Sequence, residues 1–166
     1  MAKLWNENDQ LVQGDKLLLY LVDSATVVAY ATSVSIQVDS ESIDTSSKFS
    51  CKWASAMGGK AGYTISSDAL YASNLSGTAI SFDTLLEYMV CGNQVDWYVG
   101  EEQAFSGNCE ENPHYLDMNK NYYSGKAVVT SCSLSAGANE IASCSITLTG
   151  AGPIMKNGAD IDCPDN

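Results

Sequence analysis

Apolar and polar residues alternate through two stretches near the C-terminal end of the chain, YYSGKAVVTSCSLSA (122–136) and EIASCSITLTG (140–150). Successive side chains of a β-strand point to opposite faces, so a period of two is typical of a strand that is buried on one side. The residues Gly-Ala-Asn at 137–139 separate the two stretches and favour a turn. We therefore expect this part of the chain to form a β-hairpin.

Each expected strand of this hairpin has one apolar face and one face of mostly hydroxyl side chains. The alternation places on the apolar face Val128, Thr130, Cys132, Leu134, Ala142, Cys144, Ile146 and Leu148. It places on the opposite face Val129, Ser131, Ser133, Ser135, Ile141, Ser143, Ser145 and Thr147. Ser33, Ser35 and Gln37 show the same habit in an earlier stretch. An ordinary exposed sheet carries Lys, Glu and Arg side chains, so this pattern indicates a smooth, uncharged surface or one that another molecule approaches closely.

Four further stretches are expected to form strands and one a helix. The strands are DKLLLYLVD (15–23), TVVAYATSVSIQVD (26–39), AGYTISSDALYA (61–72) and NQVDWYVGEE (93–102), of which the first two are expected to pair as a hairpin. In SFDTLLEYMVCG, Ser81 or Asp83 suits the N-cap and Gly92 suits the left-handed residue that closes a helix. The predicted fold class is therefore mainly β: an antiparallel β-sandwich or partly open barrel of two packed sheets, with one flanking α-helix at about 81–91.

A chain of 166 residues fits one domain. We expect a single domain over 1–166, with an N-terminal arm at 1–14, a long polar loop at 39–60 and a C-terminal tail at 151–166. The loop is notable because about twenty polar residues rich in Asp, Ser and Thr separate two well-formed strands.

Charge and cysteine usage limit the function classes. The chain has 8 basic and 20 acidic side chains, a formal net charge of -12, whereas a protein that grips nucleic-acid phosphates needs a basic patch. A protein that stays near DNA without holding it remains compatible. No signal peptide is evident, and the apolar run LLLYLV (17–22) is far shorter than the ~20 residues of a membrane helix. We expect cytoplasmic synthesis, six free thiols and, without a CxxC pair, no zinc site.

No residue pattern points to catalysis. His114 is the single histidine, and no nucleophile motif lies near it in the sequence. The segment GGKAG lacks the GK[ST] ending of a phosphate-binding loop. The adjacent acids at 101–102 and 110–111 are expected to be solvated loop residues rather than a glycosidase pair. We expect neither enzymatic activity nor a cofactor.

Four segments, taken in order, resemble the major tail tube protein of long-tailed bacteriophages. They are GDKLLLYLVDSATVVAYATSVSIQVDSESIDTSSK, YTISSDALYAS, SFDTLLEYMVCGNQVDWYVGE and YYSGKAVVTSCSLSAGANEIASCSITLTGAGPI. The resemblance covers the chain from about Gly14 to Ile154. The departures are the extra cysteines and an acidic loop at 100–118.

The resemblance implies a structural virion protein that assembles into stacked rings, typically of six subunits, around a channel through which the genome passes. Its expected partners are other copies of itself, the tape measure, tail terminator and baseplate or distal tail proteins, and DNA that crosses the lumen without specific binding; no membrane is involved. Its expected location is the virion tail, assembled in the bacterial host cytoplasm. The long loop would then reach a neighbouring subunit, with Phe49, Trp53 and Met57 as its anchors; the alternative is a mobile solvent loop.

DNA that slides through a channel should be repelled and not caught. Acidic residues near the bore repel phosphate, and screening limits this repulsion to roughly 8–10 Å at physiological salt. The lumen-facing candidates are Asp39, Glu41, Asp44 and Asp68, because they adjoin the Ser-rich faces.

Three other readings remain open at the level of sequence. The chain is also compatible with the tube of a contractile or secretion apparatus, which sequence separates poorly from a phage tail. A carbohydrate-binding β-sandwich would expose aromatic residues such as Trp97 and Tyr98. A hydrolase would depend on His114.

Overall fold

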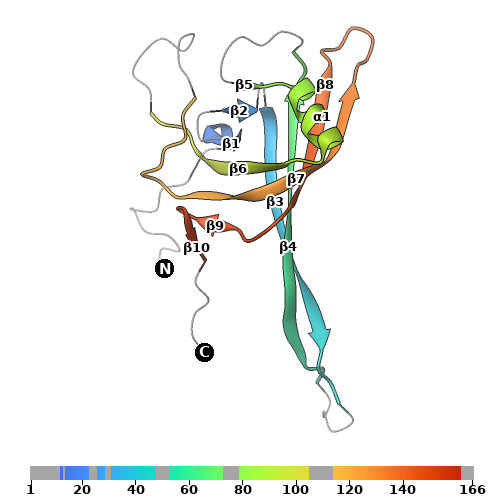
Figure 1. The fold of residues 1–166 in the computed structure, drawn as a ribbon, viewed down its shortest axis with the longest axis vertical. Helices are drawn as coiled ribbons and strands as arrows, with labels where there is room; N and C mark the ends of the chain where they lie inside the picture. The colour runs from blue at the N-terminus through green and yellow to red at the C-terminus, as the bar shows by residue number, and fades with distance from the viewer. Residues whose placement is uncertain are drawn as a thin grey trace, which may run out of the picture.

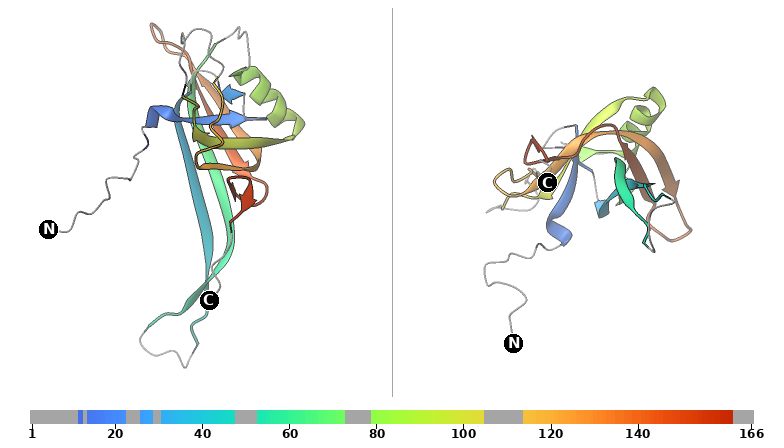
Figure 2. Two further views of the ribbon diagram at one scale, coloured as in Figure 1. Left: turned by 90° about the vertical axis from the view of Figure 1, so that its left-hand side faces the viewer. Right: turned by 90° about the horizontal axis from the view of Figure 1, so that it is seen from below.

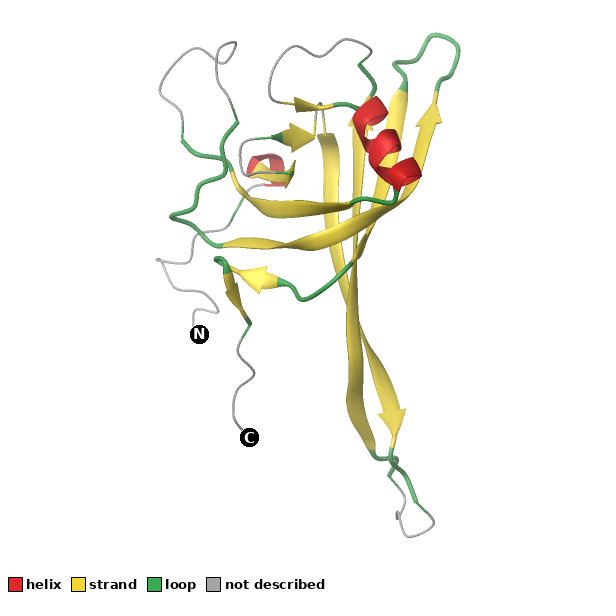
Figure 3. Cartoon of the chain, viewed as in Figure 1, coloured by secondary structure: helices red, strands yellow, loops and turns green. Residues whose placement is uncertain are grey.

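The computed structural model describes residues 12, 14–22, 26–28, 31–47, 53–72, 79–104 and 114–161 (Figure 1). A short 3-10 helix at Gly14–Lys16 is followed by β1 (Leu17–Leu21), β2 (Val27–Val28), β3 (Ala31–Asp44), β4 (Ala56–Leu70), β5 (Ala79–Ile80), α1 (Phe82–Cys91), β6 (Gln94–Glu101), β7 (Tyr122–Ser135), β8 (Ser143–Gly150), β9 (Met155–Lys156) and β10 (Ala159–Asp160). The mainly-β class with one helix is confirmed (Figure 3).

The strands belong to one sheet, in the order β3-β4-β8-β7-β6-β1-β2-β5, with β9 and β10 attached to β7. All pairs are antiparallel except β2 with β5. The sheet curls, as the right-hand view of Figure 2 shows, and β1 comes to lie against β3. The prediction of two packed sheets is therefore refined: two halves of one sheet face each other, and the sheet does not close into a barrel.

The core lies between these two halves. In the first half, Ile65 of β4 and Ile146 and Leu148 of β8 belong to one cluster. Leu19 of β1 and Trp97 of β6 join this cluster from the second half, and all five side chains are nearly inaccessible to solvent. The alternation of the sequence explains this arrangement, because every second residue is buried in β6, in β8 and in the part of β4 from Tyr63 to Ala69.

Helix α1 begins and ends as the sequence predicts. Ser81 is the N-cap, and its Oγ accepts a hydrogen bond of 3.4 Å from the backbone N–H of Thr84. Gly92 closes the helix with φ 68°, which a residue without a Cβ adopts at little cost. Leu85 is the buried residue of the helix and joins the core cluster.

The hairpin of β3 and β4 extends well beyond the body of the molecule (Figures 1 and 2). The long loop expected at 39–60 is wrong in its secondary structure, because 39–44 and 56–60 are strand and pair up to Asp44 with Ala56. The predicted strand at 26–39 is also divided: Val27 pairs with Tyr20 of β1, whereas Ala31 onward pairs with β4. We call residues 39–60 the arm.

The structure describes most of the expected C-terminal tail but little of the expected N-terminal arm. The C-terminal tail contains a small hairpin, in which β9 pairs with β10 and also with Tyr123 and Ser124 of β7. Residues 162–166 lie outside the described residues, as do 1–11 and 13 of the expected N-terminal arm.

Candidate functional site

The four strands β3, β4, β8 and β7 present a face turned away from the core that carries short polar side chains. The registers align Ser35 with Ser66, Ser66 with Thr147, and Thr147 with Ser131. The complete set is Ser33, Ser35, Gln37, Thr64, Ser66, Asp68, Ser131, Ser133, Ser135, Ser143, Ser145, Thr147 and Thr149. We call this surface the hydroxyl face. It has no long basic or acidic side chain among these positions.

A β-bulge in β7 corrects the predicted face assignment. Val129 pairs with Leu148, but the next register position joins Ser131 to Thr147, so Thr130 is the extra residue. Before the bulge the core side holds Ala127 and Val129, and after it Cys132. Val128 and Thr130 were expected on the apolar face with Cys132; that assignment is wrong because the bulge shifts the alternation by one residue. The hydroxyl positions after the bulge are as predicted.

Asp68 is the one carboxylate in the set of positions that defines the hydroxyl face, and it lies between two serines of the neighbouring strands. Ser145 Oγ donates a short hydrogen bond to Asp68 Oδ1, and Ser33 Oγ donates one of 2.9 Å to Oδ2. These bonds favour the ionised form, so they hold the pKa of Asp68 below its usual value, Ser145 more than Ser33. A fixed negative charge therefore lies on an otherwise uncharged surface.

The other three predicted acids are spread along β3 and do not gather at one point. Asp39 is on the same face as Ser35 and Gln37, whose Nε2 donates to both its carboxylate oxygens at 3.2 and 3.0 Å. Glu41 lies at a second bulge, where its Cβ stands over Gly59. Asp44 accepts the backbone N–H of Ser46 at 2.8 Å, and hydrogen bonds from Ser46 lower the pKa of Asp44.

The structure describes two of the three predicted arm anchors. Trp53 and Met57 are described and have 82% and 57% of their surface exposed. Met57 pairs with Ile43 across the arm, and Ile43 is exposed as well. Phe49 lies outside the described residues. Large exposed apolar side chains at the end of a projecting hairpin are typical of a contact surface.

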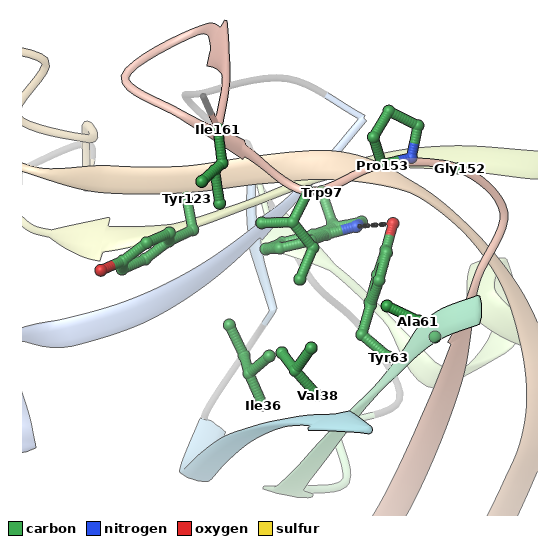
Figure 4. Close-up of a pocket in the computed structure, with 11 residues that line it drawn as sticks. Ile36, Val38, Ala61, Tyr63, Trp97, Tyr123, Gly152, Pro153 and Ile161 are labelled. Carbon is green, nitrogen blue, oxygen red and sulfur yellow. Dashed lines mark hydrogen bonds between the residues drawn. The ribbon is translucent and has the colours of Figure 1, made fainter. Parts of the chain in front are cut away.

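An apolar groove of about 470 Å³, which the sequence did not reveal, lies where the arm leaves the body (Figure 4). In Figure 4 Ile36 and Val38 rise from β3 opposite Tyr123 and Ile161. The remaining lining residues are Ala61, Gly62, Tyr63, Trp97, Gly152, Pro153 and Ile154. The lining residues come from separate elements, so no single sequence segment signals the groove.

Two strand edges of the hydroxyl face have no strand partner among the described residues. One is the outer edge of β3. The other belongs to β7 from Val129 to Ser135, because β6 pairs only with β7 residues up to Val128. Unpaired backbone donors and acceptors on a sheet edge accept another strand readily.

The described residues offer little for catalysis or metal binding. His114 is exposed and its Nδ1 contacts the carboxylate of Glu102. No cluster of metal-binding side chains occurs within the described ranges. None of the described helices is long and apolar enough to cross a membrane.

The comparison with protein families decides the identity. The family model described as phage tail tube protein matches residues 11–156. The chain belongs to the phage tail tube protein family. It is thus a structural component of a virion tail and not an enzyme. The hydrolase alternative is therefore wrong. None of the curated proteins compared with the chain matches it.

Solved structures support the fold at low sequence identity. The chain is similar to the tail protein of an empty gene transfer agent particle refined with C6 symmetry, at 17% identity and TM-score 0.63, over 87% of this chain and 98% of that one. It is similar to the SPP1 tail tube at 16% identity and TM-score 0.57, over 92% and 81%. It is also similar to the sheath/tube terminator of an extracellular contractile injection system at 12% identity and TM-score 0.60, over 90% and 98%.

Proposed function

We propose that copies of this tail tube protein join edge to edge into six-membered rings that stack into a tube, with the hydroxyl face lining the bore. The main support for this proposal is that two strand edges without a partner among the described residues bound this face, one on β3 and one on the second half of β7. Pairing these edges between copies satisfies backbone groups that a monomer leaves open.

Strand direction supports this pairing. Each of the pairs β3–β4, β4–β8 and β8–β7 is antiparallel, so the two edge strands β3 and β7 run in opposite directions. When β3 of one copy lies beside β7 of the next, the new pair is antiparallel too. The same geometry then repeats at every joint, and a head-to-tail contact that closes on rotation gives a ring.

The choice of six copies rests on the C6 symmetry of the gene transfer agent tail, whose protein shares this fold. The fold alone is common to the two chains at 17% identity, so the ring number is a proposal.

The hydroxyl face suits a bore that DNA crosses. Its short side chains offer nothing long that would catch a phosphate, and Asp68 and Asp39 add fixed negative charge. Exposed charges act over roughly 8–10 Å at physiological salt, so they repel DNA that touches the wall without closing the channel. Glu41 and Asp44 lie farther along the arm and would face the bore only if the arm does.

The arm is proposed to hold a neighbouring subunit through Trp53 and Met57, which are exposed in the single chain. Burial of these two side chains and Ile43 in an interface would remove apolar surface from water. The proposed partners beyond the chain itself are the tape measure, terminator and baseplate proteins of a tail, and the proposed place of assembly is the bacterial host cytoplasm.

A tube of a contractile or secretion apparatus is the second candidate. Chains of an extracellular contractile injection system and of the anti-feeding prophage baseplate share this fold at 12% and 10% identity. A sheath around the tails of purified particles would favour this second candidate, and bare tails the first.

Negative-stain electron microscopy of the purified chain tests the proposal. Rings or tubes with a central channel are expected. If the protein stays a dispersed monomer at concentrations well above those it reaches in the host cell, the proposal is contradicted.

A further inference from the structure

The apolar groove beside the arm is open to solvent in the single chain and has no occupant among the described residues. Its wall contains Val38, which is 59% exposed although it lies on the core face of β3. We propose that the groove receives the β7–β8 turn of a second copy in the next ring, with Ile141 and Leu134 as the inserted side chains. This inference rests on the proposed stacking of rings and names the contact that produces it.

Hydrogen bonds hold two of the aromatic side chains that line the groove. The hydroxyl of Tyr63 donates to the carbonyl oxygen of Lys126 at 2.5 Å and accepts from Trp97 Nε1 at 3.1 Å (Figure 4). The ring centroids of Tyr63 and Trp97 are 5.4 Å apart. These bonds satisfy the polar atoms at the groove floor, so the surface offered to a partner is hydrocarbon. Its volume of about 470 Å³ lies within the ~300–1,000 Å³ typical of binding sites.

The β7–β8 turn is an ordered apolar projection of matching character. Ile141 is 73% exposed, and Leu134, which lies near the end of β7 just before the turn, is half exposed. Backbone bonds fix the turn: Glu140 N–H donates to Gly137 O at 3.3 Å, and Tyr71 N–H donates to Ala142 O at 2.8 Å. A fixed conformation loses little entropy when it inserts into a second molecule.

The two surfaces lie in different parts of the molecule, as stacking requires. In Figure 1 the β7–β8 turn is at the end of the long axis opposite to the arm. The groove lies at the root of the arm, because Val38, Ala61 and Gly62 line it. A contact between such different patches is heterologous, so it repeats along the stack without closing. Trp53 of the same copy is the rival occupant, but it lies beyond Asp44 and Ala56, the last pair of the hairpin, whereas Val38 lies at the root of the arm.

Charge complementarity supports this orientation. Glu140 precedes Ile141 in the turn, and Lys156 of β9 pairs with Tyr123 at the groove. Neither side chain joins an ion pair within the described residues. A chain with net charge -12 repels its own copies, so a contact that brings one of its 8 basic side chains to an acid is favoured over other self-contacts.

Directed disulfide formation tests the contact. The variant with both Ile141→Cys and Val38→Cys is assembled, oxidised and digested, and mass spectrometry identifies the linked peptides. The expected result is a 141–38 linkage between copies and a ladder of covalent multimers on a non-reducing gel. The two single variants and the oxidised wild-type chain, with its six native cysteines, are the controls and should lack this linkage.

The outcomes separate this inference from the proposed function. Tubes without the 141–38 linkage would overturn the inference and leave the tube intact. A linkage between Trp53→Cys and Val38→Cys in its place would assign the groove to the arm tip and overturn it as well. Failure to form any ring or tube by the wild-type chain would reject the proposed function and this contact together.

A charge-reversal pair gives a second readout without new cysteines. Glu140→Lys or Lys156→Glu alone should shift the concentration needed for stacking upward, because like charges then meet. The double reversal should return it towards the wild-type value. If the double variant needs as high a concentration for stacking as the two single variants, the contact is contradicted.

Discussion

At the scale of single residues, Tyr20 is buried in the second half of the sheet, and its hydroxyl has no hydrogen-bond partner among the described residues. Burial raises the pKa of Tyr20, and the nearby charge of Glu102 raises it further. The neutral form is therefore favoured in the folded chain. A buried hydroxyl without a partner costs free energy that a phenyl ring of the same shape avoids.

Tyr20→Phe should raise the free energy of unfolding by about 1–3 kcal/mol at neutral pH. In the wild-type chain, stability is also lost as pH rises above the ordinary tyrosine pKa of ~10, because the unfolded state then releases a proton that the folded state retains. The variant should lose less stability over that alkaline range. Urea unfolding at pH 7 and pH 11 measures both effects; a less stable variant at pH 7 would show that the hydroxyl has a partner.

Gly150 is a position where close packing excludes a side chain. A Cβ there would lie 2.5 Å from ring carbons of Tyr63, whose hydroxyl is bonded to Lys126 and Trp97. Gly150→Ala should therefore destabilise the chain by ~1–3 kcal/mol through overpacking. Gly58→Ala is the matched control, because no atom lies within 4 Å of its added Cβ. Equal unfolding midpoints of the two variants would contradict this packing.

The sequence predicted which residue types form the hydroxyl face but not where the alternation shifts. Ser133 and Ser145 were assigned correctly, whereas Val128 and Thr130 were not. A bulge depends on how two strands pair, and Thr130 carries no local signal that marks it as the extra residue.

At the scale of elements, the arm is the clearest departure from expectation. Polar residues and glycines at 39–60 predicted a loop, yet 39–44 and 56–60, half of the segment, form paired strands. Period-two alternation of apolar residues marks a strand only where one face is buried in the same chain. The arm has no core of its own beneath it, so its strands left no such pattern.

Replacement of residues 45–55 by Asn-Gly should leave the fold of the body unchanged. Asp44 and Ala56 are paired, and Asn-Gly closes a two-residue hairpin turn. The variant loses Trp53, so it should remain a folded chain with a wild-type unfolding midpoint but form shorter tubes or isolated rings. Electron microscopy together with thermal unfolding measures this; tubes of wild-type length would contradict the role of the arm tip.

At the scale of the whole molecule, function depends on surfaces that one chain leaves incomplete. The fold class, the helix and the closing hairpin followed from local patterns of the sequence. The groove and the open edges did not, because they arise from strands brought together by the sheet order β3-β4-β8-β7-β6. Of the four predicted acids, Asp68 lies in the hydroxyl face, and Asp39 follows Gln37 on the same side of β3, where β3 enters the arm.

Asp39→Lys should slow genome release from particles that carry it, because a long basic side chain in the bore would catch phosphate. Asp160→Lys, which makes the same change in charge on β10 and away from the hydroxyl face, is the control and should have little effect. DNA release followed by a fluorescent dye measures the rate. Equal slowing by both variants would indicate a general effect of charge and not of position.

The most direct test of the account is a cryo-electron microscopy reconstruction of the assembled chain, which shows where each face lies. We predict that β3 of one copy pairs antiparallel with residues 129–135 of β7 in the next, and that Ser66, Asp68 and Ser145 point into the channel. An assembly in which these side chains face outward, or in which both edges stay unpaired between copies, would contradict it.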